Sequence, residues 1–121
     1  MTLCEAGQAK ESFKVALGSG GVNKRKEGDA KVPIGEYPLA PARASKDYHL
    51  FLDIGYPTPK QKKAGLTGSA VGVHGPKRGF NFPLSTSIDW TLGCIAVGTD
   101  AEIERVAAWV KGNSVRRIII E

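Results

Sequence analysis

Short apolar segments separated by glycines and prolines limit most strongly how this chain can fold. The 121 residues include 15 glycines and 7 prolines, which favour turns over long helices. Between residues 9 and 17, Phe13, Val15 and Leu17 alternate with small or polar neighbours, so one face of this segment is expected to be buried. The pattern predicts a mainly β fold rather than a helix bundle.

Further strands are predicted at residues 3–5, 32–39, 48–54, 70–75, 94–97 and 115–120. The last of these ends in three isoleucines, which predicts burial on both of its faces. Gly35 is expected to adopt a backbone conformation that other residues resist. The lysine-rich segment up to Asp29 is predicted to be a polar, mobile loop.

Residues 99–111 form the one clear predicted helix. Thr99 and Glu102 have the spacing of a capping box, and Ile103, Val106 and Val110 recur at helical intervals. Gly112 can end the helix, and residues 60–63 are predicted to form a short helical turn in a loop that flanks the candidate functional residues. We therefore expect residues 1–121 to form a single domain, a bent mixed sheet or sandwich with this helix packed on it.

The net charge of +5 allows two interpretations. Basic clusters attract polyanions such as nucleic acid, an anionic membrane or an anionic cell wall, but they also occur on ordinary solvated surfaces. No basic run alternates with aromatic residues, and no nucleic-acid-binding signature is present. We predict no nucleic-acid partner.

Other classes are disfavoured by what the sequence lacks. No Cys/His/Asp cluster has zinc spacing, so we predict no metal and no cofactor. No apolar run reaches eighteen residues, so no stable membrane insertion is expected. Residues 1–20 do not have the pattern of a signal peptide, and we expect this chain to lack a signal or anchor segment. We expect a monomer.

Cys94 and His74 are the candidate catalytic pair. Gly93 precedes the cysteine and can leave backbone amides uncovered, as an oxyanion site requires, while Gly75 follows the histidine. A thiol with an imidazole to deprotonate it is the minimum for thiol catalysis. Composition alone favours the interpretation of Cys94 as a small buried hydrophobe.

The other cysteine and the other histidine leave alternatives open. A bridge between Cys4 and Cys94 is possible in principle but would consume the proposed nucleophile. His49 is either a second imidazole of the site or a half-exposed strand histidine.

The order of several motifs resembles the L,D-transpeptidase (YkuD) catalytic domain family. Its signature is His-Gly, a spacer, and Ser/Thr-x-Gly-Cys-Ile/Val, matched by residues 73–75 and 91–95. Residues 89–96, Asp-Trp-Thr-Leu-Gly-Cys-Ile-Ala, resemble one branch of the family. Four blocks agree in order, because residues 28–37 and 48–57 also resemble this branch, so the likeness runs from about residue 7 to the end.

The resemblance implies that the protein acts on peptidoglycan stem peptides in the periplasm or cell envelope. Cys94 would be the nucleophile in a thiolate–imidazolium pair with His74, and the Gly75 carbonyl would orient the ring. The amides of Cys94 and Gly93 would hold the oxyanion. The attacked carbonyl would belong to the L-centre of the diamino acid, with terminal D-Ala leaving, and an amine would then resolve the thioester.

Two positions depart from many relatives, which have a histidine at position 92 and Arg or Asn at position 96. Leu92 and Ala96 occupy these positions here, so substrate contacts cannot be transferred by resemblance. Trp90, Lys77 and Arg78 are the candidates for substrate binding. Thr91 either contacts substrate or holds the turn, and Phe80 and Phe82 either pack their loop or line a groove.

The leading functional prediction is a cysteine L,D-transpeptidase. An L,D-carboxypeptidase or a cross-link-cleaving peptidoglycan hydrolase would use the same Cys/His pair with water as the acceptor. A secreted antibacterial effector is a further alternative. A wall-binding module without activity is the non-enzymatic one.

Overall fold

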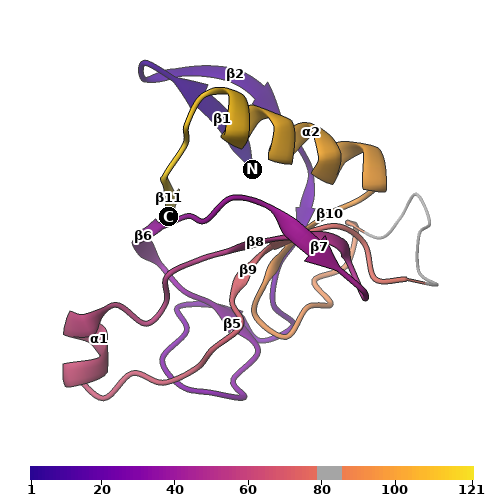
Figure 1. Cartoon of the computed structure of the whole chain (residues 1–121). Coiled ribbons are helices and arrows are strands. Elements are labelled where there is room, and N and C mark those ends of the chain that lie inside the picture. Colours follow the sequence, from indigo (N-terminus) through magenta and orange to yellow (C-terminus); the bar gives the residue numbers. More distant parts are fainter. Residues whose placement is uncertain (79–85) are drawn as a thin grey trace.

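The computed structural model describes residues 1–78 and 86–121 and is shown in Figure 1. The strands in the described part are β1 (Thr2–Glu5), β2 (Gln8–Ser12), β3 (Val15–Ala16), β4 (Gly21–Val22), β5 (Lys31–Val32), β6 (Gly35–Pro38), β7 (Arg43–Ser45), β8 (His49–Asp53), β9 (Gly72–His74), β10 (Ile95–Val97) and β11 (Arg117–Ile120). The helices there are α1 (Pro59–Lys63) and α2 (Asp100–Gly112). The prediction of a mainly β fold is confirmed.

A mixed five-stranded sheet forms the centre of the molecule. Its strand order is β3-β10-β9-β8-β7. β9 and β10 run parallel, whereas the other neighbours are antiparallel. The hairpin β1–β2 lies on the same side of the molecule as α2, and α1 lies at the opposite end (Figure 1). In the parallel pair His74, at the end of β9, lies opposite Ala96 of β10, two residues after Cys94.

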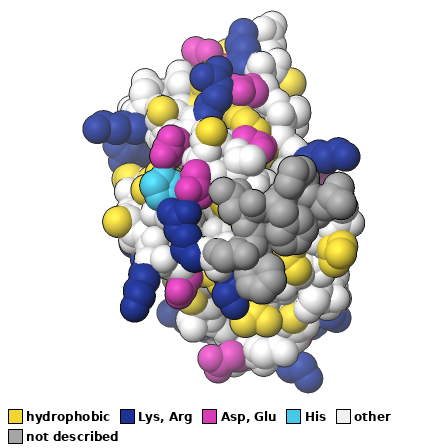
Figure 2. Space-filling view, turned by 90° about the vertical axis from the view of Figure 1, so that its right-hand side faces the viewer, with side chains coloured by type: hydrophobic (Ala, Val, Ile, Leu, Met, Phe, Trp, Pro, Cys, Tyr) yellow, Lys and Arg dark blue, Asp and Glu magenta, His cyan; other side chains and the backbone are white. Residues whose placement is uncertain are grey.

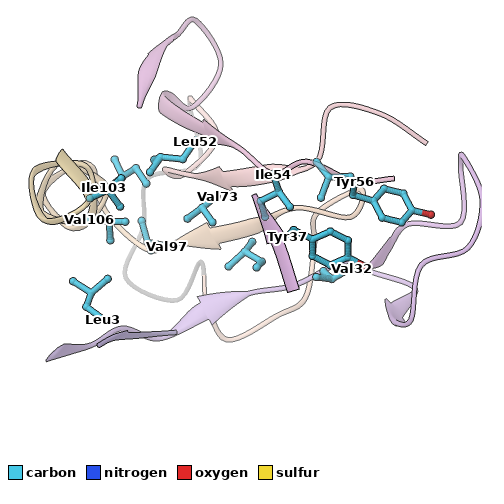
Figure 3. Packing of buried hydrophobic residues seen from close by; sticks show 13 residues of the cluster. Leu3, Val32, Tyr37, Leu52, Ile54, Tyr56, Val73, Val97, Ile103 and Val106 are labelled. Carbon is cyan, nitrogen blue, oxygen red and sulfur yellow. The ribbon is translucent and has the colours of Figure 1, made fainter. Parts of the chain in front are cut away.

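Helix α2 covers the sheet through the face that its sequence period predicts. Ile103, Val106 and Val110 are buried, and the helix packs on β8 and β10. Figure 3 shows Ile103 and Val106 at one end of the core, near Val97. The helix begins after Thr99, whose hydroxyl accepts from the Glu102 N–H at 3.1 Å, and it ends at Gly112, as predicted.

The opposite end of the core is aromatic. Tyr37 and Tyr56 meet edge to face, with ring centroids 5.9 Å apart, and Val32 lies beside them (Figure 3). Gly35 has φ of +132°, which confirms its predicted special conformation. The predicted turn at residues 60–63 is helical as well, as α1, but none of its residues line the pocket described below.

Two sequence predictions differ from the structure at the chain's edges. The long strand predicted over residues 9–17 is divided, because β2 pairs with β1 whereas β3 crosses to the central sheet. Burial of β11 on both faces is wrong: in the described part β11 pairs only with β6, and Ile119 is 60% exposed. An apolar run is therefore tolerated here on a half-covered edge strand.

The lysine-rich loop between β4 and β5 is anchored rather than loose. Lys24 and Asp29 form an ion pair at 2.9 Å, with side chains only 4% and 8% exposed. The Asp29 carboxylate also accepts the N–H groups of Arg25, Lys26 and Lys31. Because the Asp29 carboxylate binds three backbone amides, the loop is held in place and differs from the mobile loop that the sequence predicts.

Charged side chains of both signs are interspersed on the face drawn in Figure 2. Exposed ion pairs such as Arg43–Asp53 and Arg117–Glu36 contribute to this mixing elsewhere in the chain. On the face shown, the positive net charge therefore corresponds to a solvated surface rather than to a single basic field. No helix in the described part is long and apolar enough to span a membrane.

Candidate active site

The thiol of Cys94 and the imidazole of His74 line one pocket of about 380 Å³. His74 ends β9, and Cys94 directly precedes β10, its parallel neighbour. The remaining lining residues are Lys24, Glu27, Gly28, Tyr48, Phe51, Gly68, Ser69, Ala70, Val71, Thr91, Leu92 and Gly93. The structure thus brings together two residues that lie twenty positions apart.

The turn before Cys94 depends on Gly93 and Thr91. Gly93 has φ of +126°, and a side chain there would come within 2.8 Å of the Lys31 carbonyl oxygen. The Thr91 hydroxyl donates to the Cys94 carbonyl at 2.7 Å and accepts the Gly93 N–H at 3.2 Å. Of the two roles open to Thr91, its contacts are those of a residue that holds the turn.

The imidazole of His74 is fixed by a carbonyl and by stacked rings. Its Nδ1 lies 2.6 Å from the Gly75 carbonyl oxygen, and the residue is 1% exposed. A carbonyl can only accept, so Nδ1 carries the hydrogen and Nε2 is the basic nitrogen of the neutral ring. The Tyr48 ring stacks on the imidazole with centroids 3.9 Å apart, and Phe51 lies at 5.6 Å.

The Cys94 thiol donates to the Ala70 carbonyl at 3.3 Å, and no bond to His74 is formed in this structure. Burial raises the pKa of the thiol, although backbone hydrogen bonding and the Lys24 cation act in the opposite direction. Burial lowers the pKa of His74, with the Gly75 carbonyl opposing. Both shifts favour neutral forms, which differs from the ion pair expected from the sequence.

Burial of His74 makes the free energy of unfolding depend on pH. Because its folded pKa lies below the unfolded value of about 6.5, the unfolded chain binds more protons between these two values. We expect the free energy of unfolding to fall as the pH drops below about 6.5 towards the folded pKa. Urea denaturation at several pH values measures this, and His74→Gln should remove that part of the dependence. An identical pH dependence in both proteins contradicts the prediction.

The other predicted binding residues do not belong to the described wall of the pocket. The Trp90 ring is 6.0 Å from that of His74, and Arg78 forms an ion pair with Asp100 at 2.7 Å. Neither residue, nor Lys77, is among the described residues that line the pocket. Phe80 and Phe82 lie outside the described residues.

The positions that depart from the family pattern have different surroundings. Leu92 is 83% exposed at the pocket, whereas Ala96 is buried in the sheet beside His74. His49 bonds to Glu104 at 2.7 Å and does not line the pocket. Cys4 and Cys94 are both free thiols.

Sequence reasoning missed Lys24 and Tyr48 as parts of the site. Lys24 lies shortly before the Gly28-Asp29 block, and Tyr48 begins the block at residues 48–52. Both blocks contribute to the family resemblance. These blocks were interpreted as loop and strand, because nothing in one sequence shows that they meet at Cys94. Among the described residues no group of three His, Cys, Asp or Glu side chains could hold a metal ion.

Comparisons with known proteins show the family and the fold of this chain. The profile of the L,D-transpeptidase catalytic domain (YkuD) matches residues 1–120. The helical cell shape determining protein Pgp2 of Campylobacter jejuni superposes with a TM-score of 0.73 at 26% identity, and its K307A mutant with 0.72 at 26%; each comparison covers 95% of this chain and 40% of Pgp2.

Bd1075 of Bdellovibrio bacteriovorus shares the fold, with a TM-score of 0.65 at 24% identity over 94% of this chain and 39% of Bd1075. The chain thus spans about two fifths of the length of these solved relatives. No curated protein matches it. With the profile covering residues 1–120, the chain belongs to the YkuD family of L,D-transpeptidase catalytic domains.

Proposed function

We propose that this domain is a cysteine L,D-transpeptidase that acts on peptidoglycan stem peptides through a thioester on Cys94. The observation that supports it most is that Cys94 and His74 line one pocket, with Nδ1 of the His74 ring held by the Gly75 carbonyl. Family membership supports a peptidoglycan-related activity. We further propose that residues 1–121 form one catalytic domain, monomeric and located in the periplasm or cell envelope.

The first half-reaction begins from a neutral pair. Nε2 of His74 accepts the thiol proton as Sγ of Cys94 attacks the carbonyl carbon of the diamino acid's L-centre. The C–N bond to D-Ala breaks, and the imidazolium returns its proton to the departing amine. A thioester remains. Burial raises the pKa of the Cys94 thiol and lowers the pKa of His74, and we propose that proton transfer accompanies the attack.

The oxyanion of the tetrahedral intermediate needs backbone donors. Gly93 is a poor candidate, because its N–H already donates to Thr91 at 3.2 Å. The N–H of Cys94, placed by the same turn, is the donor that we propose. In the second half-reaction an acceptor amine loses a proton to His74 and attacks the thioester, which releases Cys94.

We propose that Arg78, Lys77 and Trp90 contact parts of the substrate beyond the reacting carbonyl; Trp90 is the one of these whose ring lies beside that of His74. Exposed Leu92 at the pocket is a further surface for the acceptor. The solved relative Pgp2 is named as a determinant of helical cell shape. By this likeness we propose a role in shaping the cell wall.

The test is a mass-spectrometric assay on purified tetrapeptide muropeptides, with and without an added D-amino acid. Transpeptidation predicts Cys94-dependent exchange products or dimers, together with an acylated enzyme of matching intact mass. A tripeptide product without exchange would replace the proposal with an L,D-carboxypeptidase. Absence of both product and acyl-enzyme would overturn it, with Cys94→Ala as the control.

A further inference from the structure

Lys24 is a buried cation in the wall of the pocket. Its residue is 5% exposed, and it is the only cation among the described residues that line the pocket. Two acceptors, the Asp29 carboxylate and the Lys26 carbonyl, lie at 2.9 and 3.2 Å from Nζ, and an ammonium group has three donors. Such burial is rare for lysine unless the charge is paired.

The end of the Lys24 side chain lies close to two glycines of the pocket wall, Gly68 and Gly93. A side chain at Gly68 would approach Lys24 Cε to 2.7 Å, and one at Gly93 would approach Nζ to 3.7 Å. Gly93 directly precedes the proposed nucleophile. Gly68 begins the segment whose Ala70 carbonyl accepts the Cys94 thiol. The ammonium group therefore adjoins both segments that fix the sulfur.

We propose that Lys24 is a positioning residue that acts through Cys94: its Asp29-held ammonium group supports the Gly93 turn and stabilises the thiolate as it forms. The inference rests on the proposed role of Cys94 as the nucleophile. Its test uses no peptidoglycan, so failure of one proposal is distinguishable from failure of the other.

The other groups around Cys94 leave Lys24 as the buried source of positive charge. His74 is held neutral by burial, and burial likewise raises the pKa of Tyr48, which keeps its phenol protonated. Glu27 lies in the pocket wall but is exposed to solvent. Asp53 opposes the thiolate, yet it is 43% exposed and paired with Arg43. Among the charges that act on the thiol, Lys24 is the one that favours ionisation.

The experiment measures the rate of alkylation of Cys94 by iodoacetamide against pH. Cys4 is exposed, so iodoacetamide would alkylate it as well. The experiment therefore uses a Cys4→Ser background, in which Cys94 is the single thiol. Lys24→Met removes the charge and keeps most of the side-chain volume. Lys63→Met, on exposed α1, is the matched control that removes an equal charge away from the pocket.

The expected result is a pH profile displaced to higher pH in Lys24→Met, with the same rate at the alkaline plateau. On the rising limb the alkylation rate should fall roughly fivefold at a given pH. Lys24→Arg and Lys63→Met should keep the parent profile. A folded Lys24→Met protein with an undisplaced profile, or with only a lower plateau, overturns the proposal.

A second measurement needs no variant of Lys24. In the wild-type protein the NMR signal of the Lys24 Cε should shift in a step at the pH where Cys94 ionises. The step should be missing in Cys94→Ala. If the wild-type signal shows no step at that pH, Lys24 does not sense the thiolate and the proposal is overturned.

Discussion

Cys94→Ala is expected to lower the rate of product formation from muropeptides by roughly 10³-fold or more and to abolish the acyl-enzyme. The reason is chemical: the thiol is the only group in the described pocket wall that can form a thioester. The fold should survive, because the lost thiol contributes one weak hydrogen bond to Ala70. We expect the free energy of unfolding to change by about 1 kcal/mol or less. Product analysis and urea denaturation measure the two quantities.

His74→Gln separates the base from the nucleophile. Glutamine can still donate a hydrogen bond to Gly75, but it cannot accept and return the thiol proton. The rate should fall by roughly 10²–10⁴-fold. Because burial raises the pKa of Cys94, hydroxide can replace the missing base only at alkaline pH, so alkylation of the variant should recover there. Activity that persists in Cys94→Ala would contradict the whole assignment.

The sequence predicts those parts of the fold that local patterns determine. The period of Ile103, Val106 and Val110, with Thr99 ahead of it, specifies α2 almost to the residue. The fold class also follows from the glycine and proline content. By contrast, β11 has the composition of a central strand but lies at an edge, because pairing depends on which partners the remaining chain provides.

For the site, the sequence indicates which residues matter but not what surrounds them. His74 and Cys94 are recognisable because the motifs around them resemble the signature of the family, whereas composition alone favours a buried hydrophobe at Cys94. The stack of Tyr48 on His74 and the approach of Lys24 to Gly93 join segments that are remote in sequence. The thiolate–imidazolium pair was expected without regard to burial, because only the packed structure shows which side chains are buried. Burial raises the pKa of Cys94 and lowers the pKa of His74, which is opposite to the shifts that favour such an ion pair.

The second large effect is expected for Asp29→Ala, which should lower the free energy of unfolding by about 3–5 kcal/mol. The substitution leaves the buried Lys24 ammonium without its partner at 2.9 Å. It also removes the acceptor of three backbone N–H groups in the β4–β5 loop. These contacts outweigh burial and hold the pKa of Asp29 well below its usual range, so the carboxylate is charged at neutral pH. Urea denaturation at pH 7 gives the value.

Two further variants compare the loss of the lysine with the loss of the aspartate, and the buried ion pair with an exposed one. Lys24→Met should destabilise less than Asp29→Ala, because the remaining carboxylate keeps its three amide donors and is not left uncompensated. Glu36→Ala removes an acid from the exposed pair with Arg117 and should change stability by only a small fraction of the Asp29 effect. Equal losses for Asp29→Ala and Glu36→Ala would mean that burial of the Lys24–Asp29 pair contributes nothing.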